Sequence, residues 1–143
     1  MKEVEQLVYT RLTGDIGATG LVGLLGSADR ILHGFQSAQP TVPGLTFHIY
    51  AQTPGLLGGD FIRQTELFIQ FNIFAANYSE ISFRLFMLFN GHCFAVPTNY
   101  VQVGQVSSIY DWESPDGFDE QLEIQRKDVR YRFFVVPKAQ VPI

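Results

Sequence analysis

One cysteine and three histidines are the residues of this chain best suited to chemistry. Cys93 directly follows His92, whereas His33 and His48 lie earlier in the sequence. A thiol nucleophile needs a base within hydrogen-bond reach, but adjacent residues of a strand point to opposite faces. A small buried residue is therefore the plainer interpretation of Cys93. The four residues also lack the C-x-x-C and H-E-x-x-H spacings of zinc sites, so we expect structural histidines and no metal.

Carboxylates gather late in the chain and could in principle support hydrolysis or calcium binding. They are Asp111, Glu113, Asp116, Asp119, Glu120 and Glu123. The spacing of an EF-hand loop is absent from this segment, which indicates a solvated turn. If the chain forms a ring, each copy repeats these charges, so we take Asp116, Asp119 and Glu120 as candidate acids of a lumen. We predict no catalytic residue and no cofactor site.

The segment from Asn77 to Gly91 has the pattern of a helix with two apolar faces. Ser79 is the expected N-cap of a helix over 79–90, and Gly91 is the expected C-terminal stop. At about 100° per residue, one arc contains a first apolar set that can face a sheet. This set is Ile81, Leu85, Leu88 and Phe89, and the second set, on the other side, is Phe83, Phe86 and Met87.

Glu80, Ser82, Arg84 and Asn90 are the polar residues beside the second apolar set of this helix. Among them, Glu80 and Arg84 carry opposite charges. They are four residues apart, so we expect an exposed ion pair worth about 0.3–0.5 kcal/mol. A small domain seldom leaves three large apolar side chains in water. We therefore predict that Phe83, Phe86 and Met87 form a subunit interface.

Composition limits the class of protein. The 143 residues fit one domain, over 1–143, and the single cysteine excludes an intrachain disulfide. Charged residues make up 17%, against about 25% in typical soluble chains, while aromatics reach 14%. The net charge of −4 gives no indication of a basic surface for nucleic acid. No apolar run approaches the roughly 20 residues of a membrane-spanning helix.

Hydrophobic periodicity predicts the remaining elements. Spacing of Val4, Val8 and Leu12 indicates an opening helix over 2–13. Glycines at every third position from 14 to 26 surround one expected helical turn, Thr19 to Leu25. Strands are expected over 30–33, 45–51, 61–74, 93–96, 100–112 and 129–136, with a bulge at Gly104.

The order of these elements predicts an α+β fold: an antiparallel β-sheet with a long hairpin and two main helices packed on one face. Gln52 to Asp60 is the expected hairpin loop, and its tip carries Leu56, Leu57, Gly58 and Gly59. Residues 137–143, which include two prolines, form an extended C-terminal tail able to lie on a neighbour.

This pattern resembles the small tail-terminator or tail-completion (head–tail joining) proteins of long-tailed bacteriophages. The resemblance covers most of the chain in order and spacing, although no single motif is catalytic. The matching pieces are the helix Val4–Leu12, Leu21-Val22-Gly23, Arg30-Ile31, the proline-bearing loop 40–43, the strands 45–50, 61–74 and 129–136, and the helix 79–90.

The resemblance implies a ring, commonly of six subunits, at the head-proximal end of the tail. Such a ring caps the tail tube and joins it to the connector or stopper protein of the head, while the genome passes through the lumen. It also implies a virion protein that is assembled in the host cytoplasm and has no enzyme activity. Leu56, Leu57, Gly58 and Gly59 would then lie in the arm that reaches the tube or the connector.

Two other classes of protein stay open. A small α+β domain could bind an apolar ligand in a pocket lined by its many phenylalanines. A cysteine- or metal-dependent hydrolase would use Cys93 or the carboxylates, for which the sequence indicates no substrate.

Overall fold

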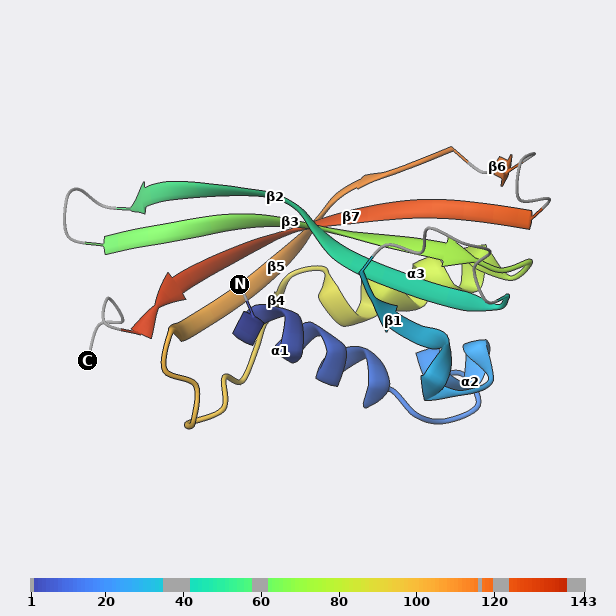
Figure 1. Cartoon of the computed structure of the whole chain (residues 1–143), viewed down its shortest axis with the longest axis horizontal. Coiled ribbons are helices and arrows are strands. Elements are labelled where there is room, and N and C mark those ends of the chain that lie inside the picture. The colour runs from blue at the N-terminus through green and yellow to red at the C-terminus, as the bar shows by residue number, and fades with distance from the viewer. Residues whose placement is uncertain (1, 35–41, 58–61, 116, 120–123, 139–143) are drawn as a thin grey trace.

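The computed structural model describes residues 2–34, 42–57, 62–115, 117–119 and 124–138 (Figure 1). The fold is α+β, as predicted. Its α-helices are α1 (Lys2–Thr13), α2 (Leu21–Leu25) and α3 (Tyr78–Phe89), and Ala28–Arg30 forms one 3-10 turn. Its strands are β1 (Ile31–His33), β2 (Gly44–Leu57), β3 (Ile62–Phe74), β4 (His92–Cys93), β5 (Val103–Glu113), β6 (Gly117–Asp119) and β7 (Ile124–Pro137).

The described strands form one mixed sheet in the order β1-β2-β3-β7-β5-β4, and β6 pairs with β7 outside this order. The expectation of a purely antiparallel sheet is wrong at one edge, because β1 pairs with β2 in parallel. The physical reason is that Arg30, directly before β1, donates to the carbonyl oxygens of Val42 and Pro43, so that β2 begins beside the start of β1. All the other strand pairs are antiparallel.

Strand β2 is longer than the sequence predicts. Its pairing with β3 runs from Gly44 opposite Phe74 to Leu57 opposite Ile62, so residues 52–57 are strand and not loop. A loop was predicted here because of Pro54, since proline cannot donate to a sheet ladder and usually marks a turn. Here β1 covers only Leu45–Phe47 of β2, so Pro54 lies where no described strand pairs with the other edge of β2.

The core lies between the sheet and the helices. In Figure 1, α1 and α2 run beneath the strands, and α3 overlaps β2 in the view. Helix α1 has the predicted bounds and buries Val4, Leu7, Val8 and Leu12. An aromatic cluster forms the centre, with the ring of Phe89 5.2 Å from that of Phe71 and 5.9 Å from that of Tyr131. Within the described residues, no helix has the length and apolarity needed to cross a membrane.

Close backbone approach explains two of the evenly spaced glycines. A Cβ atom on Gly23 would lie 2.0 Å from the carbonyl oxygen of Gly17, and one on Gly20 would lie 2.6 Å from that of Asp15. Real Cβ atoms are essentially never that close to another atom. The loop after α1 therefore folds tightly around α2, which forms within the predicted turn and buries Leu21 and Leu25.

The loop before β5 is held by the first turn of α1. The Glu3 carboxylate accepts hydrogen bonds from the backbone N–H groups of Val101, Gln102 and Val103, at 2.8, 2.9 and 2.9 Å. Burial alone would raise the pKa of Glu3, but the three N–H donors lower it overall. Gly104 follows at a shift in the β5–β7 register, which confirms the predicted bulge.

Candidate functional site

Helix α3 presents one buried and one exposed apolar face. Ile81, Leu85, Leu88 and Phe89 are buried against the sheet, as their spacing predicts. The side chains predicted to form an interface are exposed: Phe83 at 65%, Phe86 at 41% and Met87 at 49%. We call these three residues the α3 outer face.

The N-terminus of α3 differs from the prediction. The helix begins at Tyr78, one residue before the expected N-cap Ser79, and the N-cap position is occupied by Asn77. Asn77 does not cap the helix through its side chain. Its amide nitrogen donates to the carbonyl oxygen of Leu24 at 3.3 Å, which ties the start of α3 to α2.

Phe83 stands between two hollows on the surface of α3. One hollow, of about 570 Å³, is lined by residues that include Leu24, Glu80, Arg84 and Met87. The other, of about 510 Å³, lies between α3 and strands β5 and β7. A ring that is 65% exposed and lines both hollows is open to contact with a complementary surface.

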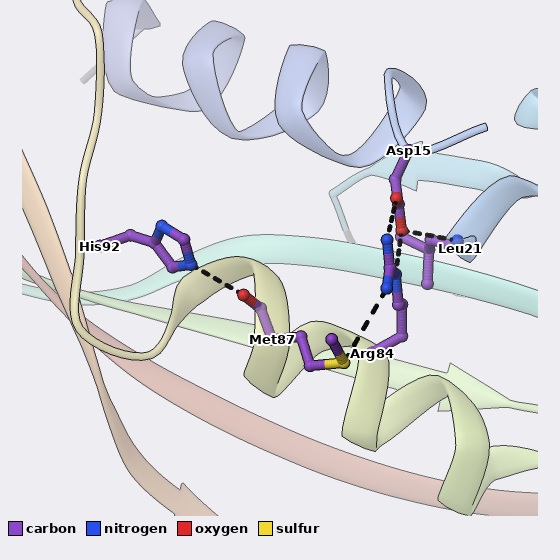
Figure 2. A network of polar contacts seen from close by, with 5 residues as sticks. All are labelled: Asp15, Leu21, Arg84, Met87 and His92. Atoms are coloured by element: carbon purple, nitrogen blue, oxygen red, sulfur yellow. Dashed lines mark hydrogen bonds and ion pairs between the residues drawn. The ribbon is translucent and has the colours of Figure 1, made fainter. Parts of the chain in front are cut away.

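Arg84 pairs with Asp15 and not with Glu80, so the predicted helical ion pair is wrong (Figure 2). The Nε and Nη2 atoms of Arg84 each donate to one carboxylate oxygen of Asp15, both at 2.6 Å. Leu21 N–H donates to the same carboxylate at 2.7 Å. Bidentate geometry favours this partner over a residue on the same helix. The hydrogen bond from Arg84 lowers the pKa of Asp15, although burial alone would raise it.

The hollow between α3 and the sheet contains a buried polar group. Tyr131 is fully buried, and its hydroxyl has no hydrogen-bond partner among the described residues. Burial raises the pKa of this hydroxyl. Lys127 Nζ lies 3.4 Å from the Glu113 carboxylate at the same hollow. Apolar rings of Phe83 and Phe86 complete the lining.

The face of the sheet away from the core carries a second exposed cluster. The guanidinium of Arg130 lies 4.1 Å from the ring centre of Tyr50 and 5.0 Å from that of Trp112. Tyr50 is 57% exposed and Trp112 is 42% exposed. We call these three residues the sheet cluster. The sequence gives no local sign of this cluster, because its members come from three different strands, β2, β5 and β7.

The predicted arm and lumen residues are described only in part. Leu56 and Leu57 end β2, in register with Arg63 and Ile62, and are not in a loop. Gly58 and Gly59 lie outside the described residues, as do Asp116 and Glu120. Asp119 is the last residue of the short strand β6.

Cys93 is exposed, so its interpretation as a small buried residue is wrong. The reason is its place in β4, a two-residue strand at the edge of the sheet that pairs only with Ser107 and Ser108. Neighbouring His92 contacts the carbonyl oxygen of Met87 through Nε2 at 2.7 Å (Figure 2). Within the part of the chain that the structure describes, no three His, Cys, Asp or Glu side chains gather as a metal site requires.

No protein-family model matches the chain, and no curated protein matches its sequence. Function is therefore inferred from the exposed surfaces, of which the α3 outer face carries three large apolar side chains on one helix.

Proposed function

We propose that this protein is a structural subunit of a long-tailed bacteriophage, a tail-terminator or tail-completion protein. In this proposal it forms a ring of six copies at the head-proximal end of the tail, in the neck of the virion. The ring caps the tail tube and joins it to the connector or stopper protein, and DNA passes through its lumen. The role requires no catalysis.

The observation that supports the proposal best is the exposure of the α3 outer face. Three large apolar side chains on a single helix are costly in water and are typical of an association surface. In a ring, each copy uses two different surfaces to contact its two neighbours, a heterologous contact that closes on itself. The proposal places Phe83, Phe86 and Met87 on one of these surfaces.

The finer architecture belongs to the same proposal. The β2–β3 pair serves as a long hairpin whose far end, with Leu56, Leu57, Gly58 and Gly59, reaches the tube or the connector. The helices cover one face of the sheet, and Asp116, Asp119 and Glu120 contribute negative charge to the lumen. Repetition of these acids in each copy would keep the passing DNA from adhering to the wall.

The mass of the protein in solution tests the ring. We expect light scattering to give a species near six times the chain mass of 16.1 kDa, or a rise toward it with concentration. Electron microscopy should then show a particle with a central hole. A strict monomer at every concentration, with and without tail-tube protein, would contradict the proposal.

A paired substitution tests the surface. Phe83→Glu combined with Met87→Glu should give monomers, because it places two charges in an apolar contact. The matched control is Gln6→Glu with Thr10→Glu, which adds the same charges at the same spacing on the exposed side of α1. The control should assemble normally. In a tube-growth assay, the wild-type ring should halt elongation of purified tail-tube protein, and the monomeric variant should not.

A second candidate function is binding of a small ligand in the hollow beside Tyr131. Its volume of about 510 Å³ is within the usual range for ligand pockets, and a buried hydroxyl faces a lining of two phenylalanines. This alternative expects a monomer or dimer that binds an apolar dye at a defined stoichiometry. Tyr131→Phe should weaken such binding, whereas it should leave a ring intact.

A further inference from the structure

The sheet cluster and α3 carry charges that complement each other, and this indicates what covers the α3 outer face. We propose that α3 of one copy docks on the sheet cluster of the next copy, with Glu80 of the first copy pairing with Arg130 of the second. The inference rests on the proposed ring and adds the identity and register of its contact.

Arg130 is held in place by two rings but has no anionic partner among the residues that the structure describes. Tyr50 and Trp112 flank its guanidinium, and no described carboxylate lies within ion-pair distance. Its Nε atom is buried without an acceptor among the described residues. By contrast, Arg132 on the same strand lies 3.7 Å from Asp111, and Arg126 lies 2.9 Å from Asp128. The Nε atom of Arg132 is buried in the same way, so what distinguishes Arg130 is the lack of a described carboxylate beside it. Arg130 is thus held in a fixed orientation by two rings and can take an anionic partner from a second copy.

Glu80 is the matching acceptor on α3. It is exposed, and no described cation pairs with it, because Arg84 is occupied by Asp15. Glu80 lines the same hollow as Phe83 and Met87, so its carboxylate lies at the edge of the α3 outer face. The α3 outer face offers the Glu80 carboxylate beside apolar side chains, and the sheet cluster offers the Arg130 guanidinium beside aromatic rings. The two surfaces therefore complement each other in charge and in apolar character.

The two surfaces lie on opposite sides of the subunit. Val129 and Tyr131, which flank Arg130 in β7, are fully buried in the core beneath α3. Since successive strand residues point to opposite faces, Arg130 points away from the helices. A head-to-tail contact between copies needs such an arrangement, because each copy must present both surfaces at once. Tyrosine, tryptophan and arginine are also the residues that contribute most to binding at protein interfaces.

Nucleic acid is the less favoured occupant of the sheet cluster. Asp111 and Asp128 neutralise the neighbouring arginines, so the face is not strongly basic. A phosphate backbone would instead need several unpaired cations in a row.

Charge reversal tests the contact. Glu80→Arg alone and Arg130→Glu alone should each raise the concentration for half-assembly by about tenfold or more, because each places like charges together. The double variant should recover most of this loss. The matched control combines Glu80→Arg with Arg132→Glu on the same face, and it should not recover assembly. All variants should keep the circular dichroism spectrum of the wild type.

Disulfide cross-linking tests the same contact if the charge-reversed variants fold poorly. In a Cys93→Ser background, Glu80→Cys with Arg130→Cys should give a ladder of disulfide-linked copies under oxidising conditions, and either cysteine alone should give none. A wild-type ring without this ladder and without charge rescue would overturn the contact but leave the ring. Absence of any ring would overturn the proposed function and the contact together. Intact rings of Arg130→Glu with weaker binding to a short DNA duplex would assign the sheet cluster to DNA.

Discussion

Asp15 and Arg84 lie 69 residues apart in the chain and share two hydrogen bonds of 2.6 Å each. Asp15 also accepts from the first residue of α2, so one carboxylate joins the end of α1, the start of α2 and the middle of α3. The same pair leaves Glu80 free at the edge of the α3 outer face. The ion pair between Asp15 and Arg84 thus leaves the carboxylate of Glu80 available for association.

Replacing Asp15 with asparagine should destabilise the fold by about 2 kcal/mol at neutral pH, because the charged hydrogen bonds to Arg84 are lost. The pKa of Asp15 lies below its ordinary value of 3.8, so the unfolded chain takes up the proton first as pH falls. The stabilisation is therefore complete above that value and is lost as pH falls through the lower, folded pKa. Urea unfolding at neutral pH and at about pH 2–3 measures this. A gap between variant and wild type that stays constant with pH would contradict the assignment.

Gly23→Ala should destabilise the protein by about 1–3 kcal/mol, since its Cβ would collide with the carbonyl oxygens of Gly17 and Ala18. Backbone atoms cannot move aside as the end of a flexible side chain can. Thermal unfolding measures the loss, and Thr19→Ala, at an exposed position of the loop that precedes α2, is the control. Equal melting temperatures for the two variants would show that the loop relaxes freely.

Alanine substitutions on the two faces of α3 should affect different properties: the stability of the subunit on the buried face and assembly on the exposed face. Leu85→Ala should cost about 2–5 kcal/mol in the unfolding of the isolated subunit, because Leu85 is fully buried. Phe83→Ala should change that quantity by no more than about 0.5 kcal/mol but should weaken assembly. Denaturant unfolding of dilute protein gives the first quantity, and light scattering gives the second. If Phe83→Ala unfolds as readily as Leu85→Ala, Phe83 belongs to the subunit's own core.

Glu3→Gln should loosen the loop before β5, because a neutral amide is a weaker acceptor for three N–H groups. Faster amide hydrogen exchange at residues 101–103 should report it, while the middle of β5 stays protected. In the wild type, the pKa of Glu3 is lowered from 4.5, so the contact is complete above that pH and weakens as pH falls through the lower folded value. Glu5→Gln, whose carboxylate lies near His33, is the control. Unchanged exchange at 101–103 in Glu3→Gln would rule out this role for the carboxylate.

Elements that depend on local periodicity could be predicted from the sequence. Helix α1 has the predicted bounds, α3 is shifted by one residue, and the bulge at Gly104 lies where a glycine interrupts an alternating strand. The division of α3 into two faces follows from a 3.6-residue period alone. Each of these features is determined by neighbours in the chain.

Features that depend on distant partners could not be predicted. Glu80 was the nearer candidate for Arg84 by sequence, but folding brings Asp15 close with better geometry. Tyr50, Trp112 and Arg130 meet because β2 and β5 both lie near β7 in the sheet order, which no single strand reveals. The parallel pairing of β1 likewise depends on contacts of Arg30 with the carbonyl oxygens of Val42 and Pro43, which local periodicity does not reveal.

The contacts of Glu3 also bear on how the chain folds as it is made. They join residues about 100 positions apart, between the first turn of α1 and the start of β5. During synthesis, α1 leaves the ribosome before Val101, Gln102 and Val103 exist, so the Glu3 carboxylate lacks these three donors until the chain extends past residue 103. The contact between α1 and the start of β5 therefore closes only after that strand has been made, and this end of the domain stays open to chaperones in the interval.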